Sequence, residues 1–495
     1  MDITMQDFIN WFSGIVWNQY FIYAFLAVGL FLTIATRFVQ VTEIKDMVRL
    51  TFNRKSSQSG ISSFQALSMS LGSRVGTGNI AGVATAIALG GPGAVFWMWL
   101  MAFLGSATSF VEITLSQVFK SKQDGEYRGG TPYYIDKGLG FTKLAIIFAI
   151  LTIIAKGFML MNIQSNTIAV AVEGAFGTHP ALLGLIIVIL FALIIFGGVK
   201  RIAKVSELAV PFMAIGYLIV TAIVLIANAS LIPDVFQLIV SSAFGMDATF
   251  GGIVGAAIAW GVQRGFFSNA AGSGGETFEG GAAEVSHPAK QGLVQSFAVY
   301  IDTWIICSAT AFMILITGMF NVEGTGTANV PGVEAGATNV QMAVDTVIPG
   351  FGYTFLALAL FFFCFTTMLS YYYKSETSLA FIKSKLKTKQ PWMEYSLKIG
   401  VLVFAFTGTV ITTGTAWTLG DIGLGSMAYV NLFGVLLLTK VALTVLKDYR
   451  EQKKLGHDPV FDPVKLGIKN ADFWEKEYNQ VEKKEKVEEK KSKVV

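Results

Sequence analysis

Two stretches of the sequence place glycine and small polar residues inside runs that are otherwise apolar. The residues concerned are Gly72, Gly76, Thr77, Gly78 and Asn79 in the first stretch and Gly261, Gly265, Ser268, Asn269 and Gly272 in the second. Glycine destabilises the interior of a helix, so each run is predicted to be a helix that breaks. A broken helix frees amide N–H groups that can hold a carboxylate and carbonyl oxygens that can hold a sodium ion. The alternative is that these glycines serve only close packing between helices.

The elements that carry these stretches are predicted to span a membrane. Of the 495 residues, 53% are hydrophobic and 14% are charged, whereas soluble domains have about 25% charged residues. Each spanning segment must satisfy its backbone hydrogen bonds internally, which favours helices. The N-terminal stretch MDITMQDFINWFSG has no Lys or Arg and so lacks the basic region of a signal peptide. The first apolar run is therefore expected to remain in the mature protein.

Eleven apolar runs are long enough to cross a bilayer as helices of about 20 residues. They lie near residues 18–37, 62–88, 93–118, 146–172, 181–199, 207–229, 249–275, 291–317, 350–380, 396–415 and 423–446. The predicted fold class is an all-α polytopic membrane protein with eleven transmembrane helices.

The basic residues test this count, because cytoplasmic loops are enriched in Lys and Arg. Basic residues occupy loops 38–61, 119–145, 200–206 and 276–290, the segment after the ninth run and the C-terminal tail. The alternate loops contain neither Lys nor Arg, and these are 89–92, 173–180, 230–248, 318–349 and 416–422. The pattern predicts a multi-pass protein of a bacterial-type plasma membrane with its N-terminus outside and its C-terminus in the cytoplasm.

The glycine-rich stretches lie in the second and seventh runs. Five crossings separate the start of the second run from the start of the seventh, and an odd number of crossings gives the two runs opposite orientations in the membrane. We therefore expect residues 62–229 and 249–446 to form two inverted repeats of five helices, each opening with a broken helix. Residues 1–61 add an N-terminal helix, and residues 447–495 form a charged cytoplasmic tail. Beyond residue 450 both charges are dense, which predicts a solvated, partly disordered or surface-helical appendage.

Several other function classes are disfavoured by the sequence. It contains no HExxH, GxSxG or Walker A motif, so neither an enzyme nor an ATP-driven pump is expected. The topology accounts for the basic residues behind the net charge of +4, so no nucleic-acid partner is expected, and no cofactor is indicated. Cys307 and Cys364 lie inside apolar runs and are interpreted as packing residues. An ion channel would favour a filter repeated around an axis, which two unlike broken helices do not provide.

Longer motifs carry a resemblance to a known family. GTGN at 76–79 resembles the unwound-helix motif of sodium-coupled amino-acid symporters with the leucine-transporter fold. GGPGAVFWMWLMAFLG at 90–105 resembles the signature of the alanine or glycine:cation symporter family, which includes the sodium:alanine symporters. Segments 128–140, 196–211, 264–272 and 285–292 also resemble that family, so the match runs over nearly the whole chain. The resemblance implies sodium-coupled uptake of a small neutral amino acid, with proton coupling as the alternative and a channel as a weaker one.

The resemblance also implies a substrate site. The amides of Thr77 and Gly78 would meet the substrate carboxylate, and Asn79 would offer its side-chain oxygen to substrate or cation. Gln164 matches a family position that faces the substrate. The remaining substrate-binding candidates are Phe267, Ser268, Asn269 and Tyr371. Asn162 and Asn166, one helical turn apart, are interpreted as hydrogen-bonding between helices.

A sodium site is implied by the same resemblance. Its ligands would be the carbonyls of Gly72 and Val75 with the hydroxyls of Thr366 and Thr367. Consecutive threonines on a helix can instead bond to carbonyls of their own helix.

Ionisable residues inside spans are costly and therefore candidates for function. Arg74 and Arg264 lie in the glycine-rich stretches, and we expect them to form a gate by pairing with acids such as Asp302, or to contact the substrate. Structural ion pairs are the alternative. Lys156, Glu112, Glu207 and Glu376 are further ionisable residues in or near spans, and titration of Glu112 or Glu207 would suit proton coupling.

The chain departs from the family at positions that bear on specificity. Ala270 stands where many relatives carry an acid, Ser370 and Tyr371 stand where many have Gly-Trp, and Arg74 replaces a small or neutral residue. The SRVGTGN and YYY patterns resemble a bacterial branch to which glutamine transport is attributed. Alanine, glycine, serine and glutamine all remain candidate substrates.

Overall fold

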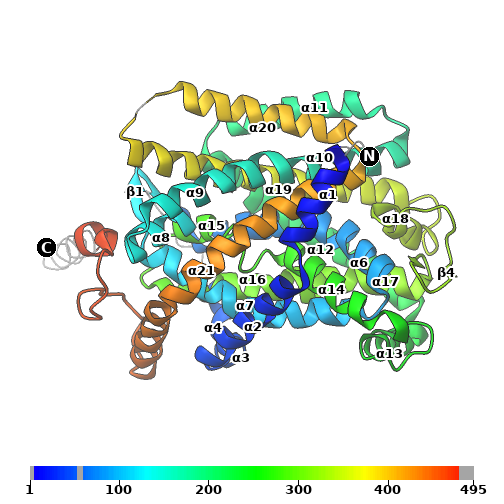
Figure 1. The fold of residues 1–495 in the computed structure, drawn as a ribbon, viewed down its shortest axis with the longest axis horizontal. Helices are drawn as coiled ribbons and strands as arrows, with labels where there is room; N and C mark the ends of the chain where they lie inside the picture. The colour runs from blue at the N-terminus through cyan, green and yellow to red at the C-terminus, as the bar shows by residue number, and fades with distance from the viewer. Residues whose placement is uncertain (1–4, 53–59, 389, 479–495) are drawn as a thin grey trace, which may run out of the picture.

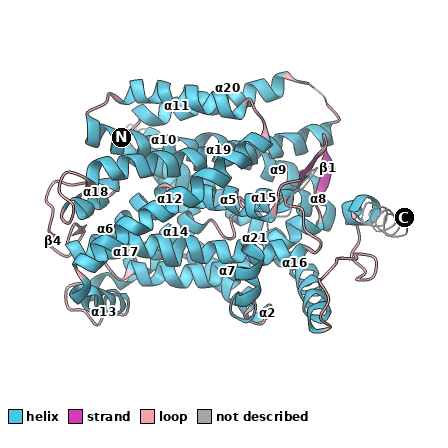
Figure 2. Cartoon of the chain, turned by 180° about the vertical axis from the view of Figure 1, so that it is seen from behind, coloured by secondary structure: helices cyan, strands magenta, loops and turns pink. Residues whose placement is uncertain are grey.

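The computed structural model describes residues 5–52, 60–388 and 390–478, and this part of the chain is built almost entirely from helices (Figures 1 and 2). The N-terminal region contains α1 (Met5–Val16), α2 (Gln19–Ala35), α3 (Val39–Thr42) and α4 (Ile44–Thr51). The side chain of Asn18 caps α2 by accepting a hydrogen bond from the amide of Phe21, which satisfies one of the free N–H groups at the helix start.

The first half continues with a helix that is interrupted and with several long helices. Its elements are α5 (Ser63–Arg74), the π-helix η1 (Gly78–Gly82), α6 (Val83–Gly90), α7 (Ala94–Val118), β1 (Ser121–Gln123), β2 (Glu126–Arg128), α8 (Thr131–Leu139), α9 (Thr142–Thr152), the π-helix η2 (Ile153–Met159), α10 (Leu160–Phe176), α11 (Pro180–Ile195) and α12 (Val199–Ala227). Strands β1 and β2 form an antiparallel hairpin.

The second half is also built mainly from helices. Its elements are η3 (Ala229–Leu231), α13 (Ile232–Ala243), η4 (Gly251–Ile253), α14 (Val254–Asn269), α15 (Thr277–Ala282), α16 (Pro288–Val299), the π-helix η5 (Tyr300–Cys307), α17 (Ser308–Thr317), β3 (Asn321–Val322), β4 (Thr327–Ala328), α18 (Ala337–Asp345), α19 (Gly352–Leu386), α20 (Trp392–Val410), α21 (Thr413–Lys454) and η6 (Trp474–Tyr478). Strands β3 and β4 form a second antiparallel hairpin.

Eight helices within the described residues are long and apolar enough to cross a membrane. They cover Ile9–Ala35, Ala94–Val118, Thr142–Phe176, Val199–Ala227, Pro288–Thr317, Gly352–Leu386, Trp392–Val410 and Thr413–Lys454. Gly78–Gly90, Pro180–Ile195 and Ala229–Ala243 are apolar but shorter. The chain is thus a helical polytopic membrane protein. The sequence expectation for 230–248 was a loop, whereas α13 lies there.

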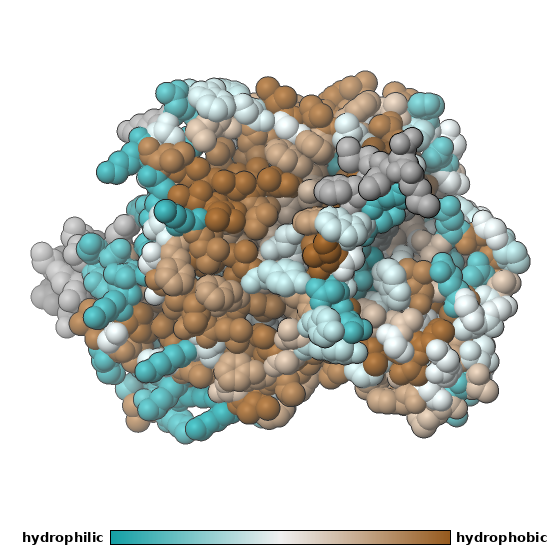
Figure 3. Space-filling view, viewed as in Figure 1, coloured by the Kyte–Doolittle hydropathy of each residue, from teal (hydrophilic) through white to brown (hydrophobic). Residues whose placement is uncertain are grey.

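The surface of the molecule fits a bilayer. On α12, the side chains of Leu208, Phe212 and Ile226 are 75–78% exposed, which is unfavourable in water but suits contact with lipid. Figure 3 shows hydrophobic residues gathered over the middle of one face and hydrophilic residues toward its left and right ends. In Figure 1, α21 runs between these ends, from the right, near the start of α1, to the left.

Both predicted helix breaks are present, but Gly261 and Gly265 of the second stretch lie inside the continuous helix α14. A Cβ on Gly261 would lie 2.5 Å from the carbonyl oxygen of Ala94, so these two glycines serve close packing against α7. α5 ends at Arg74, Val75 is extended with ψ of 98°, and η1 begins at Gly78. α14 ends at Asn269, after which Ala270 adopts a left-handed conformation with φ of 53° and residues 271–276 precede α15. We call residues 270–276 the unwound segment.

The helices pack in two groups. α7 lies along α14 and α16, so the helices around the two breaks form one group. α10 packs along α19 and α20, and α11 packs along α20; Figures 1 and 2 both show α11 and α20 side by side at one edge. α19 and α12 also contact α5, so the two groups meet at the first break.

Part of the C-terminal tail is docked, which corrects the expectation of a solvated, partly disordered or surface-helical appendage beyond residue 450. Residues 457–478, here called the C-terminal segment, fold back onto the protein and bury Phe461, Phe473 and Trp474. The indole N–H of Trp474 donates to the carbonyl of Gln117 at 2.9 Å. These aromatic side chains dock the segment despite its charged surroundings. The remainder of the predicted tail, residues 479–495, lies outside the described residues.

Candidate functional site

The four residues predicted to hold sodium come together between α5 and α19. The hydroxyl of Thr367 donates to the carbonyl oxygen of Gly72 at 2.7 Å and lies 3.4 Å from that of Val75. The side chain of Thr366 faces the same backbone, because a Cβ on Gly72 would lie 3.5 Å from its hydroxyl oxygen. Both threonine hydroxyls also contact the carbonyl of Phe363 on their own helix at 2.9 Å. The break at Val75 thus presents carbonyl and hydroxyl oxygens, a ligand set suited to a cation such as sodium.

The predicted substrate residues Thr77 and Gln164 are in direct contact. The Oε1 of Gln164 accepts hydrogen bonds from the Thr77 amide at 3.3 Å and from its hydroxyl at 3.0 Å. A Cβ on Gly76 would lie 2.9 Å from this oxygen. α10 therefore reaches the first break through Gln164.

The predicted residues Asn79 and Ser268 meet on Asp302. Asn79 donates to one carboxylate oxygen of Asp302 at 2.6 Å, and Ser268 donates to the other at 2.8 Å. Asn79 also accepts a hydrogen bond from the Gly76 amide at 3.0 Å. One buried carboxylate on the π-helix η5 thus joins both broken helices.

Phe267 and Asn269 extend the site along α14. The ring of Phe267 packs on Trp417 with centroids 4.9 Å apart. Asn269 instead donates to Thr303 at 3.3 Å and accepts from the Ala271 amide at 3.0 Å. Its side chain is therefore engaged in shaping the unwound segment.

Tyr371 lies one helical turn beyond Thr367 on α19. Its ring faces the ammonium group of Lys156 at 4.7 Å and that of Lys374 at 5.6 Å. An aromatic face attracts a cation. Tyr371 therefore lies between Thr367 and the buried ammonium groups of Lys156 and Lys374.

The two arginines do not pair with Asp302, which corrects the expected partnership. Arg264 makes a two-pronged ion pair with Asp421 on α21, with distances of 2.7 and 3.1 Å. Both residues line a cavity of about 510 Å³ at the end of the molecule where α1 begins. The Arg264 guanidinium stacks over Trp417 at 4.4 Å. Arg264 is therefore placed between this cavity and Phe267.

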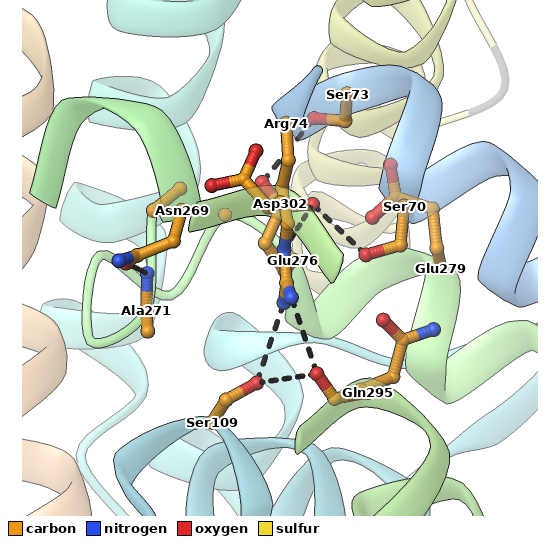
Figure 4. Close-up of polar contacts among 12 residues, drawn as sticks. Ser70, Ser73, Arg74, Ser109, Asn269, Ala271, Glu276, Glu279, Gln295 and Asp302 are labelled. Atoms are coloured by element: carbon orange, nitrogen blue, oxygen red, sulfur yellow. Dashed lines mark hydrogen bonds and ion pairs between the residues drawn. The ribbon is translucent and has the colours of Figure 1, made fainter. Parts of the chain in front are cut away.

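Arg74 does not line this cavity; Figure 4 shows its side chain directed toward Ser109 and Gln295. Its guanidinium donates to the carbonyl of Gln295 at 3.1 Å and to Ser109 at 3.3 Å. Its Nε lies 3.9 Å from the carboxylate of Glu276. Arg74 thus supports packing among α5, α7 and α16.

Glu112 stabilises the backbone of the unwound segment. Its carboxylate accepts hydrogen bonds from the amides of Gly272 and Gly274 at 3.1 and 3.3 Å and from Asn431 at 2.8 Å. Amides freed by unwinding therefore find an anionic partner on α7. Of the remaining ionisable candidates, Glu207 accepts from Gln65 at 3.0 Å, and Glu376 pairs with Arg128 at 2.8 Å.

The amide residues Asn162 and Asn166 have the structural role predicted for them. Asn166 donates to the carbonyls of Gly408 and Ile411, and Asn162 accepts from Thr407, so both join α10 to α20 or its end. Sequence reasoning missed Glu276, Asp421 and Lys374. Glu276 and Lys374 are buried charges in or beside apolar runs, which is the signal that could have identified them.

Two broken helices that meet at the centre of a helical membrane protein, beside a cluster of carbonyl and hydroxyl oxygens, define a transporter. Residues 1–463 match the family model described as "Sodium:alanine symporter family". The chain belongs to the sodium:alanine symporter family, and it is a transporter rather than an enzyme.

Relatives match along nearly their full length. YrbD of Bacillus subtilis (strain 168), whose name includes the words "sodium/proton-dependent alanine carrier protein", is 53% identical over 478 residues, which cover 96% of this chain and 98% of that protein. The sodium/proton-dependent alanine carrier protein of Bacillus sp. (strain PS3) is 49% identical, covering 88% of this chain and 99% of that protein. GlnT of Bacillus subtilis, whose name includes "sodium/glutamine symporter", is 41% identical, covering 93% and 94%.

Proposed function

We propose that this protein imports a small neutral amino acid by coupling its uptake to the entry of sodium. The observation that carries the proposal is the bridge made by Thr367, whose hydroxyl joins α19 to the carbonyl of Gly72 at 2.7 Å. A sodium ion bound among Gly72, Val75, Thr366 and Thr367 would replace this hydrogen bond with shared coordination. Sodium would then stabilise the break at Val75, and with it the amides beyond the break.

The substrate would bind between the two broken helices. The amides of Thr77 and Gly78 would hold its carboxylate, as free N–H groups at a helix start do. Asn79, Gln164, Ser268 and Asn269 would supply polar contacts, and Phe267 and Tyr371 would enclose the side chain. Sodium and substrate would both stabilise the same conformation of the first break. Binding of one ligand would therefore raise the affinity for the other, which is the basis of coupling.

Alternating access follows from two inverted repeats of five helices, residues 62–229 and 249–446, after an N-terminal segment of residues 1–61. α7 and α16, α10 and α19, and α11 and α20 would be repeat equivalents. The members of each pair are in contact, which supports a twofold axis that passes between them. The group containing α5–α7 and α14–α17 would rock against the group containing α10, α19 and α20. Eleven crossings would leave the N-terminus outside and the tail, residues 447–495, in the cytoplasm of a bacterial-type cell.

The cavity beside Arg264 would then be the external entrance, because α1 begins at that end. The Arg264–Asp421 pair would gate the path from this entrance to Phe267. Arg74 would stabilise the moving group, and Asp302 would couple the two broken helices.

Alanine is the proposed substrate, with glycine, serine and glutamine as alternatives. The names of two relatives include alanine, and that of a third includes glutamine. The Phe267–Trp417 contact narrows the space beside the breaks, which favours a short side chain.

Uptake into proteoliposomes tests the proposal. Purified protein would be given labelled alanine, glycine, serine or glutamine with and without an inward sodium gradient. We expect sodium-dependent accumulation that Thr367→Ala abolishes. The matched control is Thr439→Ala, because the Thr439 hydroxyl donates to the carbonyl of Val435 on its own helix. Uptake indifferent to sodium would contradict the sodium site.

Proton coupling is the second candidate, and Asp302 favours it. Its carboxylate is buried and bonded to Asn79, Ser268 and Thr303, so a proton taken up there would alter contacts at both breaks. A proton gradient applied without sodium distinguishes the two cases. Uptake driven by that gradient and lost in Asp302→Asn would favour the proton.

A further inference from the structure

Lys374 ties one long helix to both broken helices. Its ammonium group donates to the hydroxyl of Ser73 on α5 and to Glu276 at 2.7 Å, at the end of the unwound segment. It also lies 3.5 Å from Glu279 on α15. The side chains of Lys374, Glu276 and Glu279 are fully buried.

This contact lies on the same helix as the sodium residues but at a different depth. Lys374 follows Thr367 by seven positions on α19, which is two turns or about 10 Å. α19 therefore bonds to α5 at Gly72 through Thr367, at Met69 through Ser370 and at Ser73 through Lys374. Separating α19 from α5 must break all of these contacts, of which only that of Lys374 carries charge.

A second cavity begins just beyond Lys374. It has a volume of about 330 Å³ and is lined by Tyr373 and Glu376, the neighbours of Lys374 along α19, and by Arg128 of the β1–β2 hairpin. In Figure 1 this hairpin lies at the end opposite the start of α1. Lys374 thus stands between the sodium residues and the cavity at the end that we assign to the cytoplasm.

Lys374, Glu276 and Glu279 form a buried ion cluster, with the ammonium group 2.7 Å from Glu276 and 3.5 Å from Glu279. Separating the partners in a dry interior would leave buried charges uncompensated. Opening of this contact is therefore expected to bring water from the neighbouring cavity to these charges.

We propose that Lys374 is the positioning residue that keeps the pathway closed to the cytoplasm. Its ion pair with Glu276 holds α5 and α15 against α19, and release of this pair exposes the sodium residues to the cavity beside Tyr373. The inference rests on the proposed alternating access. The Lys374–Glu276 contact lies on the same helix as the sodium residues. It determines whether the sodium site is open to the cytoplasmic side of the membrane.

Sided cysteine labelling tests the proposal. Ser378→Cys provides a reporter at a buried position one turn beyond Lys374 on α19, and the unsubstituted protein supplies the background of the buried residues Cys307 and Cys364. Inside-out and right-side-out vesicles would be treated with a membrane-impermeant maleimide without substrate. Lys374→Gln is expected to raise the labelling rate from the cytoplasmic side about tenfold, the effect of a population shift of about 1.4 kcal/mol. Labelling from the outer side should not rise.

Two variants protect the test against misfolding. Glu276→Gln breaks the same ion pair from the other partner and should raise labelling in the same direction, while Lys374→Arg should restore the parent rate. The matched control is Lys383→Gln, because Lys383 lies on the same helix but pairs with Glu394 on α20. Parent-like labelling in both folded variants, Lys374→Gln and Glu276→Gln, would overturn the proposal, as would an increase confined to the outer side.

The labelling also separates this proposal from the transport mechanism on which it rests. Sodium should slow the labelling of the parent if it stabilises the closed breaks. If sodium has no effect while Lys374→Gln still accelerates labelling from the cytoplasmic side, the sodium site is wrong and the role of Lys374 stands. If sodium slows labelling in the parent and Lys374→Gln changes nothing, the role of Lys374 is wrong and the sodium site stands.

Discussion

Gly78 and Ser268 bring the two broken helices into backbone contact. A Cβ atom on Gly78 would lie 3.0 Å from the Cα of Ser268 and 3.1 Å from the ring of Phe267. Only a residue without a side chain permits this approach. The contact places the amides beyond the first break directly beside the residues that precede the second.

Replacing Gly78 should therefore impair substrate binding. The added methyl group of Gly78→Ala would force the broken helices apart, and overpacking of this kind costs about 1–3 kcal/mol. We expect the KM for the amino acid to rise about five- to a hundredfold while the protein remains folded. Gly216→Ala on α12 is the control, because a Cβ there meets nothing within 4 Å. A normal KM in Gly78→Ala would argue against this substrate site.

The Arg264–Asp421 pair should be sensitive to loss of either partner. Both side chains are less than a tenth exposed, so Asp421→Asn leaves a buried guanidinium without its counter-charge, at a cost of about 3–5 kcal/mol. We expect a lower melting temperature in detergent. The double variant Arg264→Met with Asp421→Leu should recover most of the loss, since both charges leave together. An exposed pair, Lys447–Glu451, should change stability by at most about 1 kcal/mol when broken.

Trp474 should control docking of the C-terminal segment. The side chain is fully buried, and Trp474→Ala removes its packing, which costs about 3–5 kcal/mol for a buried tryptophan. The segment should then become a substrate for added protease while transport helices stay resistant. Trp392→Ala is the control, because that indole is 60% exposed. Equal protease resistance in both variants would mean that other contacts dock the segment.

Docking of the C-terminal segment should strengthen as the pH rises above 7. Lys120 lies beneath Phe473 and Trp474 with its ammonium 4.7 and 5.0 Å from their rings. Burial lowers the pKa of Lys120 to about 7, with Glu284 opposing the shift. Docking therefore releases a proton between pH 7 and about 10, the usual lysine pKa. Docking should gain up to about tenfold per pH unit in that window and stay constant below it.

The protease assay can measure this pH dependence as a ratio. Cleavage of the parent relative to Lys120→Met at each pH cancels the pH response of the protease itself. The ratio should fall with rising pH from 7 to 9, because the variant has no proton to release. If the ratio does not change with pH, titration of Lys120 does not contribute to docking of the C-terminal segment.

The predictions from sequence differ in how they fared. The glycines around residues 76 and 272 marked both breaks, because glycine lowers the stability of a helix, although Gly261 and Gly265 remain helical in α14. The sodium quartet Gly72, Val75, Thr366 and Thr367 came from a resemblance, and the structure brings it together. Arg74 and Arg264 lie beside acids as predicted, but the acids are Glu276 and Asp421 in place of Asp302. The sequence does not show which of several distant acids packs against each arginine.

What the sequence by itself determined is the membrane class and the positions of the breaks. Both depend on local rules, namely that a bilayer demands about 20 apolar residues per crossing and that glycine weakens a helix. Only the tertiary structure decided the partner of each buried charge, the capping of the unwound segment by Glu112 and the docking of Trp474. Each of these is a contact between distant parts of the chain, and its energy depends on burial and geometry that no short stretch of sequence contains.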